Sequence, residues 1–194
     1  MLDNINLLNF GKKEVDRNVY LMMSDINQQS CADAIQWILS HNFATEDENG
    51  EEYKRPECLT LIISSQGGDL YDANALISVM RGSAIPVSTI GIGMIASAGL
   101  LIFMAGHRGL RILDENCFCM SHSFSSGIAG TKHDLFGAQK HFAQIQKTMV
   151  RMYKKFTDLE ESVIEQKLLP PTDVWLEPTE MVELGMADHV QNMK

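Results

Sequence analysis

The sequence predicts an α/β protein in which a largely parallel β-sheet is covered by helices. Short apolar, β-branched runs alternate along the chain with segments whose apolar residues recur at steps of three and four. Such alternation favours right-handed crossovers between parallel strands. The chain has 194 residues, of which 45% are hydrophobic and 21% charged. That composition supports one buried core and excludes disordered or low-complexity protein classes.

The first predicted elements form a strand and a one-faced helix. Residues 1–17 are polar without a sustained period, so we expect an N-terminal arm there. A short apolar strand over 19–22 is followed by helix N-cap residues and then by a helix over 28–41, whose apolar residues recur at steps of three and four. Residues 44–57 are acidic and contain a glycine and a proline, which predicts an exposed connection.

A second strand and helix are separated by a pair of glycines. The run over 58–65 is apolar and predicts a buried strand that ends at Gly67 and Gly68. Asp69 then opens a helix, whose apolar residues continue on one face to about Met80. The glycine pair therefore lies at the end of a strand and just before a helix.

Residues 84–106 carry no charge and are long enough to span a bilayer. The first part, 87–92, is β-branched, and glycines at 91, 93 and 99 interrupt the run before it becomes leucine-rich. The rest of the chain offers no second hydrophobic span and no asymmetry of flanking basic residues. We therefore expect a buried strand, a turn and a buried helix through Met104, and no membrane partner.

Two further strands and a long helix complete the predicted elements. Strands are expected over 110–113 and 117–121, and a helix over about 132–156. The helix carries one apolar seam at alternating steps of three and four: Leu135, Ala138, Phe142, Ile145, Met149, Met152 and Phe156. The predicted helix is well above the average length of about 11–12 residues. Its apolar seam could pack on the protein's own core, or the helix could project and pack against another subunit.

The charge balance and the cysteines exclude several classes of function. Sixteen Lys and Arg against 25 Asp and Glu give a net charge of −9, which disfavours long-range attraction to nucleic acid. The four cysteines are interpreted as small buried residues in a reducing cytoplasm, because the sequence shows no signal-peptide pattern and a chain of this length needs no disulfide framework. The Cys117 and Cys119 pair has no second pair beside it, and no nucleotide-binding glycine motif occurs, so we expect neither metal nor cofactor.

Three features at predicted strand ends could carry chemistry. Ser97 lies at a strand-to-helix turn among small residues, where its hydroxyl could act as a nucleophile. His122 ends a strand, and an imidazole there could take the serine proton. The Gly67–Gly68 turn could direct backbone N–H groups at an anion, together with the N–H of Ala98. Each feature also has a structural explanation: Ser97 as a small buried residue, His122 as a structural histidine and the glycines as a tight turn.

The order of these features resembles the proteolytic subunit of the Clp protease family (ClpP), serine peptidases of crotonase-like fold. Residues 64–68 are similar to the family's oxyanion loop N-S-P-G-G, and 93–99 to its nucleophile segment G-Q-A-A-S-M-G. Residues 119–122 match the histidine segment M-I-H, and 175–188 resemble the C-terminal motif F-L-S-A-x-E-A-V-E-Y-G-L-x-D. The resemblance covers roughly residues 18–190.

The resemblance implies a crotonase/ClpP-like fold of repeated ββα units with a long protruding handle helix. Residues 18–194 would form one serine peptidase domain. Its head would comprise 18–122 and 158–194, and its handle about 123–157. The segment 123–130 would be a glycine-rich strand beside the handle.

The resemblance also implies a Ser-His-Asp catalytic site with an oxyanion hole. The positions that match the family's motifs are Ser97, His122 and Asp173, with the backbone N–H groups of Gly68 and Ala98 as oxyanion donors. Asp173 depends on one short alignment, and Asp158 and Glu177 are poorer alternatives by position.

The partners implied are those of a chambered protease. We expect an endopeptidase subunit that does not itself use ATP and forms a heptameric ring, single or doubled, or a mixed ring with related subunits. An AAA+ unfoldase would feed it unfolded polypeptides, and the location would be cytoplasmic. The alternatives are a crotonase-type acyl-CoA enzyme, a non-catalytic ring subunit and a capsid-maturation peptidase.

Overall fold

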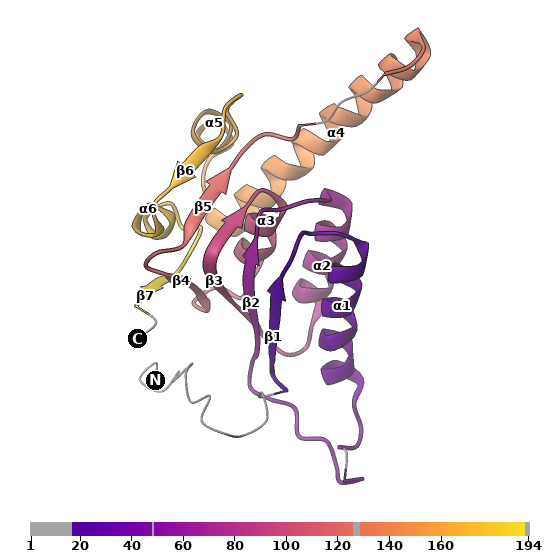
Figure 1. The fold of residues 1–194 in the computed structure, drawn as a ribbon, viewed down its shortest axis with the longest axis vertical. Helices are drawn as coiled ribbons and strands as arrows, with labels where there is room; N and C mark the ends of the chain where they lie inside the picture. Colours follow the sequence, from indigo (N-terminus) through magenta and orange to yellow (C-terminus); the bar gives the residue numbers. More distant parts are fainter. Residues whose placement is uncertain (1–16, 48, 126–128, 193–194) are drawn as a thin grey trace.

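The computed structural model describes residues 17–47, 49–125 and 129–192, and within them seven strands form one sheet (Figure 1). The strands are β1 (Val19–Met23), β2 (Leu59–Ser65), β3 (Val87–Ala96), β4 (Arg111–Asp114), β5 (Phe118–Ser121), β6 (Val174–Leu176) and β7 (His189–Gln191). The helices are α1 (Gln28–Phe43), α2 (Leu70–Gly82), α3 (Ala98–Met104), α4 (Lys132–Thr157), α5 (Glu161–Val163), the π-helix η1 (Ile164–Leu168) and α6 (Pro178–Glu183).

The main sheet is parallel and has the strand order β1-β2-β3-β4-β7. Strand β3 changes its neighbour along its length: Ile90 pairs with Ile112 of β4, whereas Ile95 pairs with Cys119 of β5. Strand β5 pairs in turn with β6, and this pairing is antiparallel. The second half of β3, β5 and β6 therefore form a separate branch of the sheet.

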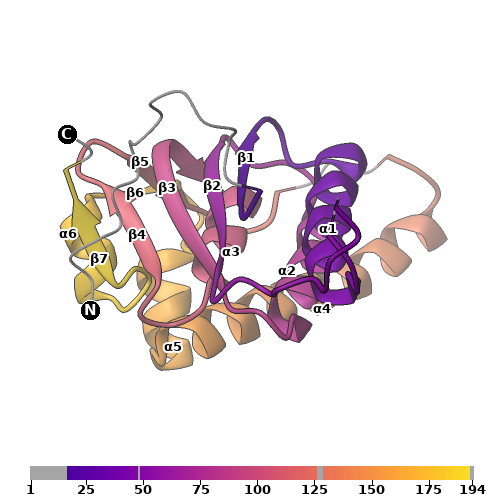
Figure 2. The same cartoon turned by 90° about the horizontal axis from the view of Figure 1, so that it is seen from below.

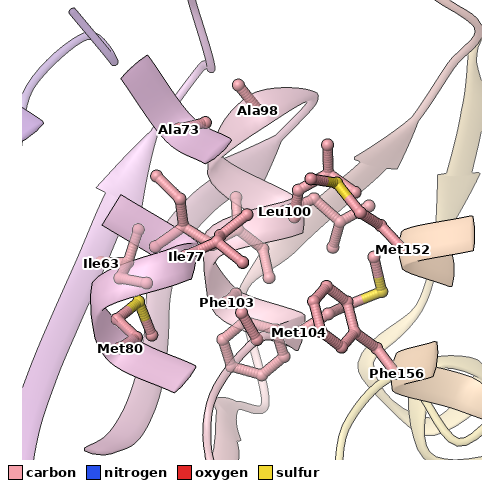
Figure 3. Packing of buried hydrophobic residues seen from close by; sticks show 14 of the residues in the cluster. Ile63, Ala73, Ile77, Met80, Ala98, Leu100, Phe103, Met104, Met152 and Phe156 are labelled. Atoms are coloured by element: carbon pink, nitrogen blue, oxygen red, sulfur yellow. The ribbon is translucent and has the colours of Figure 1, made fainter. Parts of the chain in front are cut away.

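The core lies between the sheet and the helices on one of its faces. Figure 2 shows α2 and α4 on the same side of the strands. Every residue of α3 is buried. Figure 3 shows Phe103 and Met104 of α3 between Ile77 of α2 and Phe156 of α4. Burial of this apolar area is the main favourable contribution to folding, at about 25 cal/mol per Å².

Helix α4 belongs to the core along only part of its length. It begins with a capping box formed by Thr131 and Asp134. Its C-terminal half buries the seam residues Ile145, Met149, Met152 and Phe156. Its N-terminal half projects beyond the sheet (Figure 1), and Leu135 and Phe136 there are 47% and 62% exposed. The seam thus packs on its own core at one end and extends away from the sheet at the other.

A buried ion pair anchors the C-terminal segment. Arg111 of β4 is 3% exposed, and its Nη2 lies 2.6 Å from Oδ1 of Asp188. Its Nη1 also donates to the carbonyl oxygen of Phe156 at 2.9 Å. Burial alone would raise the pKa of Asp188, but the hydrogen bonds and charge of Arg111 outweigh it and hold this pKa below its ordinary value. One guanidinium therefore joins β4, the end of α4 and the segment before β7.

Most predicted elements are confirmed, with two corrections. The strand predicted over 87–92 continues to Ala96, because Gly93 adopts a φ of 60° within the strand and does not end it. In the segment 123–130, residues 123–125 and 129–130 do not form the expected strand, and 126–128 lie outside the described residues. The predicted arm, apart from residue 17, also lies outside them.

The expectations for cysteines and membrane spans can also be compared with the structure. All four cysteines, Cys31, Cys58, Cys117 and Cys119, are free thiols. Among the helices of the described part of the chain, none is both long and apolar enough to cross a membrane. Residues 84–106 fold instead into the strand, turn and buried helix that the sequence predicts. The division into head and handle stays a prediction.

Candidate active site

Ser97 lies at the sharp turn between β3 and α3. Its backbone has φ 55° and ψ −122°, a positive-φ conformation that costs a residue with a side chain about 1–3 kcal/mol. Its N–H donates to the carbonyl oxygen of Met120 at 3.0 Å, so the turn is fixed to β5. The buried helix α3 follows directly and holds the turn from the other side. The serine is therefore held in a strained but well-anchored conformation.

His122 follows β5 and reaches the serine hydroxyl. The pairing of Ala96 with Met120 aligns the ends of β3 and β5 at the same sheet edge. The Nε2 atom of His122 lies 2.7 Å from the Oγ atom of Ser97. This is hydrogen-bond distance, as proton transfer from the hydroxyl to the imidazole requires.

Asp173 lies beside the other nitrogen of the same imidazole. In the antiparallel pair, Ser121 is opposite Val174, so the residues just beyond them, His122 and Asp173, are neighbours. The Nδ1 atom of His122 is 3.9 Å from Oδ1 of Asp173, which is longer than a hydrogen bond. The Asp173 side chain is 58% exposed. The structure thus brings the three predicted residues together, but the hydrogen bond between His122 and Asp173 is not formed.

The two other carboxylates considered from the sequence have different partners. Asp158 is the C-cap of α4, and Arg108 forms an ion pair with it. The hydrogen bond that Arg108 donates to Asp158 holds the pKa of this carboxyl group below its ordinary value. Glu177 is the N-cap of α6. Within the described residues, neither carboxylate forms a hydrogen bond or ion pair with His122.

The glycine pair after β2 packs against the serine turn. Gly67 and Gly68 have φ values of 103° and 147°. A Cβ on Gly67 would lie 2.7 Å from the Cβ of Ser97, and one on Gly68 would lie 2.1 Å from the carbonyl oxygen of Ile26. Both positions therefore require glycine for conformation and for space.

Backbone N–H groups from both turns remain available for a ligand. Within the described part of the chain, neither the N–H of Gly68 nor that of Ala98 donates to a protein acceptor. Both residues line a small pocket of about 100 Å³ together with Ser97 and His122. A pocket that joins a hydroxyl, an imidazole and two backbone N–H groups can hold a carbonyl group and stabilise an oxyanion.

The apolar wall of this pocket was not predicted from the sequence. It is formed by Leu70, Leu101, Phe124 and Met149. Leu70, Leu101 and Met149 lie in predicted helices, and Phe124 lies in the segment 123–130. The periodic patterns indicated burial but could not indicate that these side chains meet beside Ser97.

The described residues suggest no metal site. Among residues 17–47, 49–125 and 129–192, no group of three or more His, Cys, Asp or Glu side chains could hold a metal ion. The hydrogen bond that the Cys119 thiol donates to Cys117 is the largest cause of a raised pKa at Cys119, and burial raises this pKa further. That thiol therefore stays protonated at neutral pH, as expected for a structural cysteine.

Comparison with known proteins gives a consistent family assignment. Residues 15–194 match the family model described as Clp protease. The ATP-dependent Clp protease proteolytic subunit of Deinococcus radiodurans is 33% identical over 132 residues, which are 68% of this chain and 64% of that protein. Proteolytic subunit 2 of Rhodococcus jostii is 29% identical over 132 residues, 68% of this chain and 67% of that protein. The aligned part of the chain thus spans just under two thirds of the first relative's length.

A solved structure supports the fold. A single-residue mutant of ClpP1 from Listeria monocytogenes matches 92% of this chain and 96% of its own, with a TM-score of 0.76 and 20% sequence identity. The expected crotonase/ClpP-like fold is thereby confirmed.

Proposed function

Because the chain belongs to the Clp protease family, we propose that it is the proteolytic subunit of a chambered serine endopeptidase, with Ser97, His122 and Asp173 as its catalytic residues. The observation that carries this proposal is the 2.7 Å approach of His122 Nε2 to Ser97 Oγ, beside the N–H groups of Gly68 and Ala98. An acyl-CoA enzyme of the same fold would need the oxyanion donors but not this pair.

The proposed reaction is acyl transfer through the serine. His122 Nε2 accepts the proton of Ser97 Oγ as that oxygen attacks the peptide carbonyl carbon. The resulting oxyanion accepts hydrogen bonds from the N–H groups of Gly68 and Ala98. The C–N bond then breaks, and His122 returns the proton to the leaving amine. Water hydrolyses the acyl-enzyme by the same steps.

Asp173 is proposed to orient and stabilise the imidazole. In the neutral imidazole, a carboxylate that accepts a hydrogen bond from Nδ1–H keeps the proton on that nitrogen and leaves Nε2 free to act as base. At 3.9 Å the two atoms must approach by roughly 1 Å to form this bond. The 58% exposure of Asp173 supports such a movement, because little packing opposes it.

The assembly we propose is a heptameric ring, single or doubled, or a mixed ring with related subunits. The projecting half of α4 supports it, because the exposed Leu135 and Phe136 offer apolar surface to another subunit. The substrates would be unfolded polypeptides supplied by an AAA+ unfoldase, since the sequence contains no P-loop for ATP. A cytoplasmic location and the head-and-handle division belong to the same proposal.

The test combines covalent labelling, peptide hydrolysis and native mass. Wild-type protein should be labelled by a fluorophosphonate at Ser97, hydrolyse a short fluorogenic peptide and have the mass of a ring. Ser97→Ala should lose labelling and hydrolysis but keep the mass. Ser88→Ala is the matched control, because Ser88 is a buried serine that donates to Leu110 O at 2.7 Å at the other end of β3. An unlabelled wild-type ring would identify a non-catalytic subunit, and an unlabelled monomer would contradict both parts of the proposal.

A further inference from the structure

Two serines flank His122 in the chain, and both bind the same short segment. The hydroxyl of Ser121 donates to the carbonyl oxygen of Leu168 at 2.5 Å. The hydroxyl of Ser123 donates to the carbonyl oxygen of Leu169. The strand end that carries His122 is therefore attached on both sides to residues 168–169, which lie 46 to 47 positions further along the chain.

The inner of these two contacts is part of a buried hydroxyl network. Ser121 is fully buried, and its Oγ also lies 2.5 Å from the phenolic oxygen of Tyr153, which is 1% exposed. Burial raises the pKa of Tyr153 to about 12, so the phenol keeps its proton at any physiological pH. Helix α4, strand β5 and the segment 168–169 thus meet at one hydroxyl.

The attached segment is the end of the π-helix η1. The N–H of Leu169 donates to the carbonyl oxygen of Ile164 at 2.9 Å, which is the five-residue step of a π-helix. The last carbonyls of a helix have no partner within it. Leu168 and Leu169 are buried, so water cannot supply the missing donors. The two serine hydroxyls supply them.

The end of η1 leads directly to Asp173. Only three residues separate Leu169 from Asp173 along the chain, and two of them are Pro170 and Pro171, which fix their own φ angles. A fixed point at 168–169 followed by a stiff connection limits where the carboxylate can lie. The same fixed point holds the strand end on which the imidazole is carried.

We propose that Ser121 and Ser123 are positioning residues that hold His122 in register with Asp173. We call this pair of contacts the serine clamp: the hydroxyls of Ser121 and Ser123 on the carbonyl oxygens of Leu168 and Leu169. The inference rests on the proposed catalytic roles of His122 and Asp173. It goes beyond them by naming what sets the distance between the two side chains.

The clamp is needed because little else fixes this distance. The β5–β6 pairing involves only three residue pairs, and Asp173 lies outside them on an exposed strand end. The contact between Nδ1 and Oδ1 is already 3.9 Å, so a further shift would disconnect the carboxylate. Misplacement by about 1 Å can cost a reaction roughly 100-fold. Loss of one clamp contact should allow part of such a shift.

The test measures peptide hydrolysis by the assembled protein. Ser123→Ala should lower kcat by about tenfold and leave KM within about twofold, because the clamp acts on the imidazole and not on substrate binding. Ser123→Thr keeps a hydroxyl and should restore most of the rate. Ser121→Ala should also lower kcat, but it leaves Tyr153 and Leu168 without a buried partner. The half-buried Ser123 therefore provides the variant whose fold is least disturbed.

A double-mutant cycle with Asp173→Ala separates positioning from general destabilisation. If the clamp acts through Asp173, Ser123→Ala should change kcat by less than about twofold in the Asp173→Ala background. The control Ser88→Ala removes a comparable buried hydroxyl bond far from the site and should leave kcat unchanged.

The outcomes are distinct. A wild-type rate in both Ser121→Ala and Ser123→Ala, or the same tenfold loss with and without Asp173, would overturn the clamp while leaving the proposed peptidase intact. Wild-type protein without hydrolysis or fluorophosphonate labelling would instead overturn the proposed function, and the clamp with it.

Discussion

The contact between Gly67 and the serine turn allows a quantitative prediction. In Gly67→Ala, the new Cβ would lie 2.7 Å from the Cβ of Ser97 and 2.8 Å from the carbonyl oxygen of Ala96. Carbon atoms normally approach to about 3.5–4.0 Å, so the two turns must separate by about 1 Å. A displacement of this size should lower the rate of covalent reaction at Ser97 by about 100-fold. The φ of 103° adds about 1–3 kcal/mol of backbone strain to the cost of folding.

The assay for Gly67→Ala is the rate of fluorophosphonate labelling, with urea unfolding as the measure of stability. Gly82→Ala is the matched control, because a Cβ on Gly82 would meet nothing within 4 Å at the end of α2. It should react at the wild-type rate and gain up to about 1 kcal/mol from helix propensity. If Gly67→Ala were labelled as fast as Gly82→Ala, the packing of the glycine loop against Ser97 would not control the reaction.

Three further predictions concern the acid, the buried ion pair and the core. Asp173→Ala should lower kcat by about 100-fold, and an unchanged rate in steady-state hydrolysis would show that another group orients the imidazole. Asp188→Asn leaves Arg111 buried without a counter-charge and should lower the free energy of unfolding by about 3–5 kcal/mol at pH 7. Because the pKa of Asp188 is held below its ordinary value of about 3.9, wild-type stability should fall as the pH drops below that value, and this part of the pH dependence, measured by urea unfolding, should be missing in the variant. Phe103→Ala should cost about 3–5 kcal/mol by thermal or urea unfolding, whereas the exposed Phe136→Ala should change stability little.

The long helix shows how well local signals predict structure here. Its observed bounds, Lys132–Thr157, differ from the predicted 132–156 by one residue. A sustained apolar period defines its body, and Thr131 with Asp134 caps its start. Both signals lie within the segment itself, so no information about the rest of the fold is needed.

The C-terminal strands could not be predicted in this way. Strands β6 and β7 have three residues each, too few for a pattern, and they form because β5 and β4 offer free edges to them. The juxtaposition of His122 and Asp173 depends on one of these pairings. Their closeness was therefore inferred from family resemblance alone, and their catalytic roles stay a prediction.

Strand β3 is longer than the sequence predicted. Glycines at 91 and 93 suggested that the strand ends near residue 92, whereas it continues to Ala96. A Cβ on Gly91 would lie 2.7 Å from Cδ2 of Leu113, so this glycine allows close packing against β4. Gly93 follows at the point where β3 leaves β4 and joins β5. Glycine here marks a change of partner and not the end of a strand.

The position of β7 has a consequence for synthesis of the chain. Its partner β4 lies 77 residues earlier in the chain. The same separation holds for the ion pair of Arg111 with Asp188, in which Asp188 directly precedes β7. A ribosome that has released residues 111–114 must make most of the remaining chain before this sheet edge can be covered. Until then the edge exposes unpaired N–H and C=O groups, which invite association with other strands. Shortened chains that lack 189–191 should therefore aggregate during production even where the turn that carries Ser97 is fully formed.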